Sequence, residues 1–119
     1  MTTKEILNLD CREKENQEII QRVLRQIKPL SKYSDECDIP LSAIEKAIMI
    51  MCRKYAIGIM NLVPDMYSNE TQTIWRATII NDETIKAIDT VYGISFYDVS
   101  AKIAIRMYSE VKRGIKLRS

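Results

Sequence analysis

The stretch that decides the fold runs from Thr71 to Gly114 and reads TQTIWRATIINDETIKAIDTVYG, followed directly by ISFYDVSAKIAIRMYSEVKRG. Its first part is dense in β-branched residues, which pack well on a pleated sheet and lose side-chain freedom in a helix. The polar tetrapeptide Asn81–Thr84 interrupts this part and suits a hairpin loop. We therefore predict two strands, 71–80 and 85–92, joined by a short turn.

The second part of the stretch carries the signals of a helix at both ends. Ser95 is a favoured N-cap residue, and Asp98 places negative charge at the positive end of the helix. Gly114 is typical of the position just past a helix C-terminus. Between these ends, one apolar stripe at helical spacing contains Phe96, Val99, Ile103, Met107 and Val111. A helix over about 96–113 is therefore predicted to cover the sheet.

A third strand is predicted ahead of that stretch, over residues 55–63. Gly58 disfavours a helix there by about 1 kcal/mol relative to alanine. Apolar residues alternate along the segment, as they do in a strand with one buried face. The residues assigned to the buried face are Ile57, Ile59 and Val63, with Asn61 as the one polar exception.

Two further helices are predicted closer to the N-terminus. The first is expected over about 11–28. Asp10 and Glu13 form an acidic capping pair at its start, and Pro29 prevents its continuation. A loop over 29–41 follows. The second helix is expected to begin with a capping box formed by Ser42 and Glu45, and its apolar residues occupy more than one side. That distribution is typical of a central helix.

Together these elements predict one α+β domain that spans residues 1–119, a length sufficient for a real core. The expected order is α-α-β-β-β-α, with a three-stranded antiparallel meander and the helices packed on one face. The α-β-β-β-α core is expected over about 42–113. Residues 114–119 are expected to form a frayed basic tail.

The portion over about 42–113 resembles double-stranded-RNA-binding domains in its order of elements. The resemblance implies a cluster of lysines at the start of the last helix, where that family contacts phosphates. The corresponding positions here are Phe96, Tyr97 and Asp98, and Lys102 follows one turn later. The resemblance therefore supports the fold, and we do not carry RNA binding over to this chain.

A helix-turn-helix is the alternative interpretation of the same region. The segment Gly93–Ile103 is similar in register to the turn and second helix of helix-turn-helix proteins, which read DNA in the major groove. This interpretation requires residues 84–92 to form a helix. Asp89 stands where a small residue is normal, and the side chains at the start of the second helix are apolar and acidic. Both features favour the hairpin.

Composition excludes several kinds of functional site. The chain has no histidine, which removes the commonest general base and the commonest metal ligand. The three cysteines, Cys11, Cys37 and Cys52, show neither a CxxC spacing nor an even number for a disulfide framework. No apolar stretch is long enough to span a membrane. We expect a non-catalytic, cytoplasmic protein without metal or cofactor.

Surface recognition is therefore the expected mode of action. The leading hypothesis is a small intracellular interaction or accessory protein, bound to a protein partner or to itself as a homodimer through a sheet edge or an apolar helix face. The alternative is a nucleic-acid-binding protein that uses the basic C-terminal region or the segment Gly93–Ile103. The net charge of +2 is too small to favour nucleic acid by itself.

The candidate interaction surface combines aromatic and basic side chains. Within the basic region, Glu110 is the only acid that opposes the positive charge in the local sequence. Trp75 is expected to act mainly as a core anchor of the sheet. The full set of candidates is Trp75, Tyr92, Tyr97, Tyr108, Lys102, Arg106, Lys112, Arg113, Lys116 and Arg118.

Overall fold

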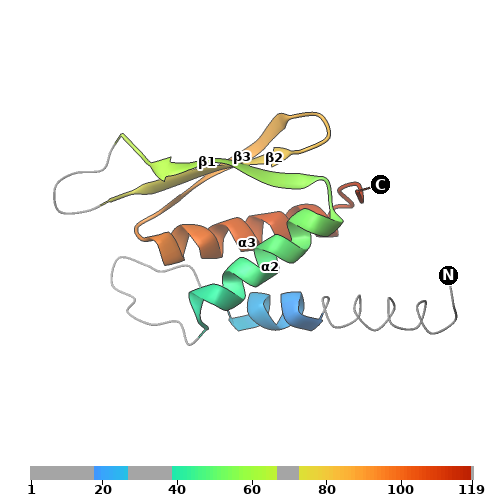
Figure 1. The fold of residues 1–119 in the computed structure, drawn as a ribbon, viewed down its shortest axis with the longest axis horizontal. Coiled ribbons are helices and arrows are strands. Elements are labelled where there is room, and N and C mark those ends of the chain that lie inside the picture. The colour runs from blue at the N-terminus through green and yellow to red at the C-terminus, as the bar shows by residue number, and fades with distance from the viewer. Residues whose placement is uncertain (1–17, 27–38, 67–72, 119) are drawn as a thin grey trace, which may run out of the picture.

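The computed structural model describes residues 18–26, 39–66 and 73–118. These ranges contain a helical segment over 18–26, then α2 (Leu41–Lys54), β1 (Ile57–Pro64), β2 (Trp75–Asn81), β3 (Lys86–Gly93) and α3 (Phe96–Lys112). The order α-α-β-β-β-α confirms the predicted α+β fold (Figure 1). The outer parts of the first predicted helix, most of the loop that follows it, Cys11 and Cys37 lie outside the described residues.

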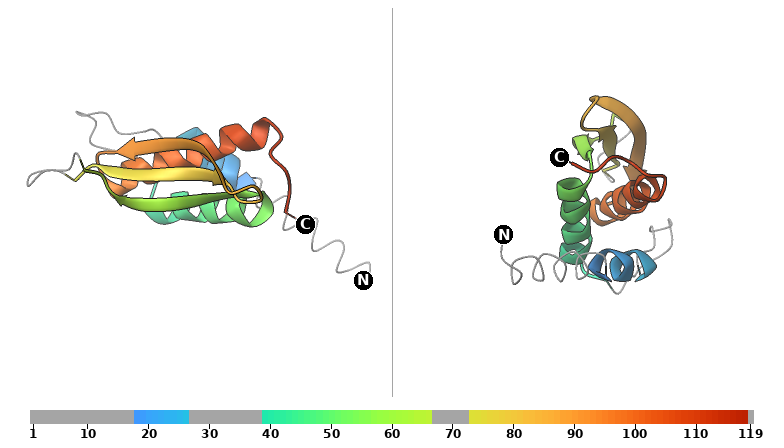
Figure 2. Two further views of the ribbon diagram at one scale, coloured as in Figure 1. Left: turned by 90° about the horizontal axis from the view of Figure 1, so that it is seen from above. Right: turned by 90° about the vertical axis from the view of Figure 1, so that its right-hand side faces the viewer.

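The sheet is the predicted antiparallel meander. Its strands lie in the order β1-β2-β3, and both neighbouring pairs are antiparallel. Figure 2 shows the described helices on one face of the sheet, and no described element covers the other face. Because β3 occupies residues 86–93, the helix that a helix-turn-helix needs at 84–92 does not form, and that interpretation of the region is wrong.

The core lies between the sheet and the helices. Ala77 and Ile79 of β2 are fully buried against α2 and α3, and the predicted stripe of α3 points into the same core. Each large apolar side chain buried in this way contributes about 1.5–3 kcal/mol of transfer free energy. The largest fully buried apolar side chains are Ile20, Ile44, Met51, Ile57, Ile79, Val99, Ile103 and Met107.

The β2–β3 turn forms where the sequence predicted it, with a later start for the strand. The side-chain oxygen of Asn81 accepts hydrogen bonds from the backbone N–H groups of Glu83 (3.0 Å) and Thr84 (3.2 Å). Ile85 belongs to the turn, because its φ is 56° and β3 begins only at Lys86.

The predicted capping box of α2 is wrong. The helix begins at Leu41, its N-cap residue is Pro40, and no side chain bonds to the cap. The carbonyl of Pro40 instead accepts from the N–H groups of Ala43 and Ile44, at 3.0 and 3.4 Å. The helix therefore starts earlier than predicted, which places Ser42 within its first turn.

A bulge in β1 changes which side chains face the core. Asn61 has a φ of 60°, and the pairing with β2 shifts between Met60 and Val63. Asparagine tolerates this left-handed conformation better than most residues. Beyond the bulge, Leu62 packs on the core and the side chain of Val63 is 38% exposed. The assignment of Val63 to the buried face is therefore wrong, because simple alternation does not survive a bulge.

Ser95 caps α3 as the sequence predicted, and Asp98 and Gly93 tie the start of this helix to the end of β3. The hydroxyl of Ser95 accepts from the N–H of Asp98 at 3.0 Å, and the buried carboxylate of Asp98 accepts from the N–H of Ile94 at 3.0 Å. Gly93 permits this close approach, because a Cβ added there would lie 2.3 Å from the backbone nitrogen of Val99.

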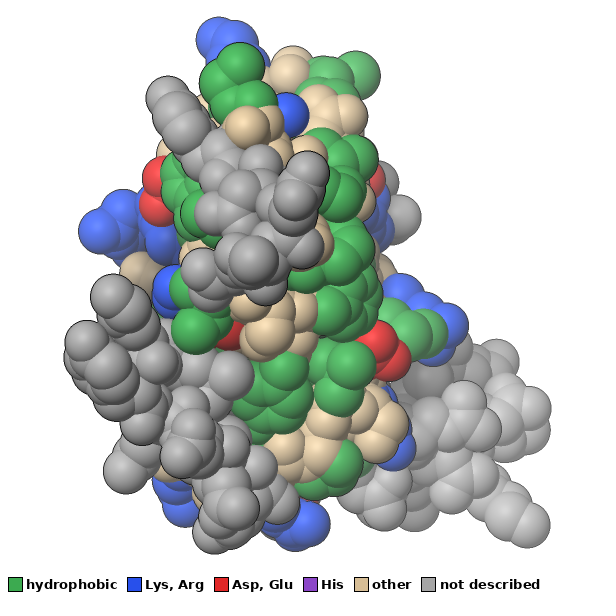
Figure 3. All heavy atoms as spheres, turned by 90° about the vertical axis from the view of Figure 1, so that its left-hand side faces the viewer, with side chains coloured by type: hydrophobic (Ala, Val, Ile, Leu, Met, Phe, Trp, Pro, Cys, Tyr) green, Lys and Arg blue, Asp and Glu red, His purple; other side chains and the backbone are tan. Residues whose placement is uncertain are grey.

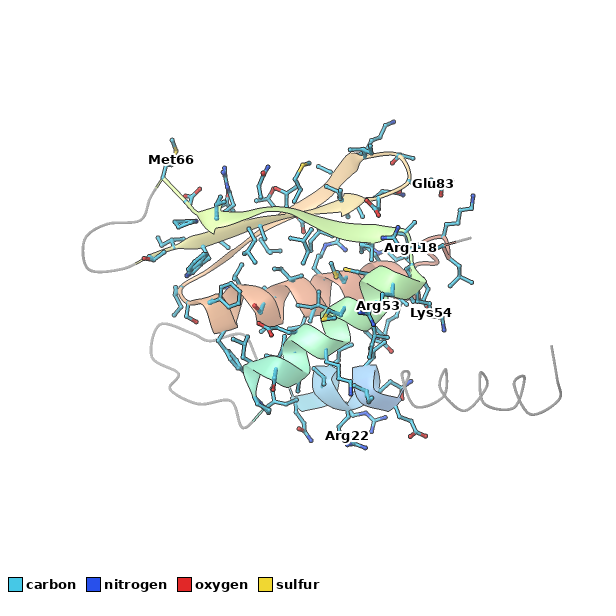
Figure 4. The ribbon with its side chains drawn as sticks, in the orientation of Figure 1. Arg22, Arg53, Lys54, Met66, Glu83 and Arg118 are labelled. Carbon is cyan, nitrogen blue, oxygen red and sulfur yellow. The ribbon has the colours of Figure 1, made fainter. Side chains whose placement is uncertain are left out.

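The C-terminal residues pack on the fold, so the prediction of a frayed tail is wrong for 114–118. The carbonyl of Lys116 accepts from Ala56 at 2.8 Å, and the N–H of Arg118 donates to Lys54 at 2.9 Å. The Arg118 side chain also donates to the carbonyl of Cys52 at 2.6 Å, at the last turn of α2. Figure 4 shows Arg118 between the end of α2 and the β2–β3 turn that carries Glu83.

Candidate interaction site

The fold brings acids to most of the predicted basic residues. Glu110 is the only acid in the local sequence, and the fold adds acids from the β2–β3 turn, β3 and the first turn of α3. Five of the six basic candidates form ion pairs: Lys102 with Asp98, Arg106 with Asp89 and Glu110, Arg113 with Glu110, Lys116 with Glu83, and Arg118 with Asp82. The sixth, Lys112, lies over the ring of Tyr108, with its ammonium 4.9 Å from the ring centroid.

These pairs bear on the nucleic-acid alternative. Phosphate binding needs positive charge that is available to the ligand, and its strength follows the number of phosphates neutralised. In this chain the acids reduce the positive potential along α3 and the C-terminal segment. The nucleic-acid alternative stays a prediction, and the observed charge pairing weighs against it.

The four aromatic candidates do not form one cluster. Trp75 is half-buried against the core and meets Phe96 edge to face, with ring centroids 5.4 Å apart. The hydroxyl of Tyr97 donates to the carbonyl of Ile39 at 2.8 Å, whereas Tyr108 lies about 16 Å further along α3. Tyr92 of β3 is 47% exposed. Trp75 therefore has the contacts of a core anchor, and Tyr92 is the most accessible of the four.

Hydrophobic side chains gather on the end of the molecule where α3 begins. Figure 3 shows them as a band that runs from the sheet towards the helices. Met66, two residues past the end of β1, and Ile94, just before α3, are exposed. Figure 4 shows Met66 at this end of the sheet.

A groove lies between β3 and α3. It has a volume of about 530 Å³ and is lined by Val91, Tyr92, Lys102, Ile105, Arg106 and Ser109. Three of these residues, Tyr92, Lys102 and Arg106, are candidates from the sequence that the fold places together. Sequence reasoning missed Val91, Ile105 and Ser109 as surface residues. The structure leaves Ile105 37% exposed in the groove.

The edge of β3 runs along this groove. The N–H of Thr90 donates to the side chain of Asp89 at 2.9 Å, which places it on the outer side of the strand. In an antiparallel strand alternate residues share this orientation, so the N–H and C=O of Tyr92 also point away from β2. The C=O of Thr90 and the N–H and C=O of Tyr92 therefore lie on the outer edge of β3 beside the groove, whereas the N–H of Thr90 is already bonded to Asp89.

The opposite edge of the sheet, β1, is protected. The bulge at Asn61 interrupts its regular spacing, and Pro64 has no N–H to offer. At its start, the Arg118 guanidinium donates to the carbonyl of Ile57 at 3.2 Å. Of the two sheet edges, β3 over residues 89–93 is thus the one with a regular register and no proline.

Two cations supply the charge in the groove. The ammonium of Lys102 binds the fully buried carboxylate of Asp98 at 3.0 Å, which uses one of its three donors. Arg106 donates through Nε to Asp89 and through Nη1 to Glu110. The hydrogen bond with Glu110 raises the pKa of Arg106 above its ordinary value, so the guanidinium stays charged. No hydrogen bond to a described residue occupies its Nη2.

The described residues offer little for covalent or metal chemistry. Within 18–26, 39–66 and 73–118, no group of three or more Cys, Asp or Glu side chains is arranged to hold a metal ion. Burial raises the pKa of the Cys52 thiol, although Arg118 partly offsets this effect. A thiol with a raised pKa is a weak nucleophile near neutral pH. None of the helices in the described ranges is long and apolar enough to cross a membrane.

Comparison with protein-family models, with curated proteins and with solved structures finds no match to this chain.

Proposed function

We propose that this chain is a non-catalytic protein-interaction domain that binds an extended segment of a partner along β3. In this mode the bound segment becomes a fourth strand of the sheet. Backbone hydrogen bonds to the sheet edge provide affinity, and side-chain pockets beside the edge provide specificity.

The observation that carries this proposal is the position of the β3 edge beside the groove. Tyr92 directs its N–H and C=O outward, and Thr90 directs its C=O outward while its N–H is bonded to Asp89. The groove next to them is lined by residues of both β3 and α3. Its volume of about 530 Å³ is large enough to receive side chains of an added strand. The bulge and the proline in β1 hinder strand pairing at that edge of the sheet. This supports the choice of β3, where neither feature interrupts residues 89–93.

A peptide library tests the proposal. The full chain is immobilised and panned with a phage-displayed library of random nine-residue peptides, and the enriched peptides are titrated by NMR. We expect chemical-shift changes at residues 89–93 and along the groove face of α3. Failure to select any peptide that binds below about 100 μM, or shift changes confined to the opposite face of the sheet, would reject the proposal.

Two substitutions at Tyr92 isolate the backbone contribution. Tyr92→Pro removes the outward N–H, and Tyr92→Thr removes the ring but keeps that N–H. The ladder to β2 does not use this group, so an edge strand tolerates proline here. We expect Tyr92→Pro to bind the selected peptides about fivefold to tenfold more weakly than Tyr92→Thr, since one hydrogen bond is worth about 1 kcal/mol. Equal affinities for two folded variants would contradict strand addition.

A further inference from the structure

We infer that residues 116–118 form a strap that opens independently of the rest of the fold, and that ion pairs with the β2–β3 turn hold it closed. The strap lies across the junction of α2 and β1, where its backbone pairs with residues 54–56. A rise in ionic strength weakens the ion pairs and therefore favours the open state. This inference goes beyond the proposed function, because it concerns a part of the molecule outside the β3 edge and its groove.

The backbone of the strap pairs like a short antiparallel strand. The N–H of Ala56 donates to the carbonyl of Lys116 at 2.8 Å, and the N–H of Arg118 donates to the carbonyl of Lys54 at 2.9 Å. These two bonds flank a single antiparallel bridge, the smallest unit of strand pairing. The closed strap therefore occupies backbone groups that a strand from another chain would need, and its opening releases the N–H of Ala56.

The apolar packing of the strap is weaker than that of the residue before it. Leu117 is 54% exposed, and a hollow of about 270 Å³ lies between the strap, Ala56 and the β2–β3 turn. Ile115, by contrast, packs against the core, and its N–H donates to the carbonyl of Glu110 at 3.1 Å. The C-terminal segment is therefore anchored as far as Ile115, and only the residues beyond it open.

Charge provides much of the attraction that closes the strap. Nη1 of Arg118 lies 2.6 Å from Oδ2 of Asp82, and Nζ of Lys116 lies 3.1 Å from Oε1 of Glu83. The four side chains are between 37% and 70% exposed, so dissolved salt reaches both pairs and screens them. An exposed ion pair of this kind shifts an equilibrium by about 1.4-fold to 5-fold, so the loss of two pairs has a measurable effect on opening.

Native-state hydrogen exchange of the full chain, followed by NMR in 10 mM and in 1 M NaCl, tests this inference. The screening length falls from about 30 Å to about 3 Å between these conditions. In 10 mM NaCl we expect the Ala56 and Arg118 amides to have similar protection factors, both lower than those of the β2 amides. In 1 M NaCl their exchange should accelerate at least about twofold relative to β2. Protection equal to that of β2, or exchange that does not respond to salt, would overturn the inference.

A double variant separates the ion pairs from other effects of salt. Asp82→Asn with Glu83→Gln removes both carboxylates, so the Ala56 amide should exchange at least about twofold faster in 10 mM NaCl and lose its salt response. Glu18→Gln with Glu45→Gln changes the net charge equally at two exposed acids of the helices, and this matched control should exchange like the unsubstituted chain. If the Ala56 amide exchanges at the same rate in both double variants, ion pairs do not hold the strap closed and the inference is wrong.

Discussion

Replacement of Gly93 by alanine is expected to be among the most damaging single-methyl changes in this protein. A Cβ at this position would lie 2.3 Å from the backbone nitrogen of Val99, 2.6 Å from its Cα and 2.7 Å from its Cβ. Two of these three atoms belong to the backbone of the first turn of α3, so no side-chain rotation can relieve the overlap. The end of β3 and the start of α3 must move apart instead.

The magnitude follows from what that movement disrupts. Overpacking a rigid contact by one methyl group typically costs about 1–3 kcal/mol. The displacement would also strain the capping of α3 by Ser95 and Asp98, which adds about 1 kcal/mol. We therefore expect Gly93→Ala to lower the free energy of unfolding by about 2–4 kcal/mol. The free energy of unfolding of a typical domain is about 5–15 kcal/mol, so this loss is a large share of it.

The two other glycines serve as controls for this prediction. At Gly58 an added Cβ would have its nearest neighbours at 3.7 Å, an ordinary contact, so Gly58→Ala should be neutral or slightly stabilising. At Gly114 nothing lies within 4 Å, but φ is +94°, so Gly114→Ala should cost about 1 kcal/mol through backbone strain. Urea denaturation followed by far-UV circular dichroism ranks the three variants. If Gly93→Ala loses no more stability than Gly114→Ala, the close packing of β3 on α3 is refuted.

Substitutions at three further residues test other parts of the fold. Asp98→Ala removes the acceptor of the Ile94 N–H and the partner of Lys102, so it should lower the free energy of unfolding, measured by urea denaturation, by about 2 kcal/mol. A loss below about 0.5 kcal/mol would show that this buried carboxylate does not hold α3 in place. At the β1 bulge, where φ of Asn61 is 60°, Asn61→Gly should leave the free energy of unfolding nearly unchanged, and Asn61→Val should lower it by at least about 1 kcal/mol. Equal thermal midpoints for the two variants would argue against the bulge. The Ala56 amide donates to the carbonyl of Lys116, and Arg118→Ala should accelerate hydrogen exchange at this amide. An unchanged exchange rate would show that the C-terminal segment packs without the Arg118 side chain.

The elements that the sequence predicted well are those specified by local chemistry. β-branched residues on both sides of a polar tetrapeptide indicated the β2–β3 hairpin, and Ser95 with Asp98 indicated the start of α3. Both signals lie within a few residues of the structure that they specify. The structural role of Gly93 was not predicted, because its close contact with Val99 depends on how β3 meets α3.

The features that sequence reasoning missed depend on contacts between distant segments. Asp82 and Arg118 are 36 positions apart, and no periodic pattern links the C-terminal segment to β1 or to the β2–β3 turn. The bulge at Asn61 did leave a local signal, since the polar residue interrupted an apolar face, but alternation alone does not distinguish a bulge from a polar exception. Ile105 falls next to the buried stripe of α3, and its exposure depends on how far the sheet extends over that helix.

The most direct test of strand addition is the measurement of NMR contacts between a bound peptide and β3. With isotope-labelled protein and an unlabelled selected peptide, we expect nuclear Overhauser effects between the peptide backbone and the backbone of Thr90 and Tyr92, together with slower amide exchange at Tyr92. Contacts located instead at the uncovered face of the sheet, around Met60 and Thr78, would contradict binding at the β3 edge.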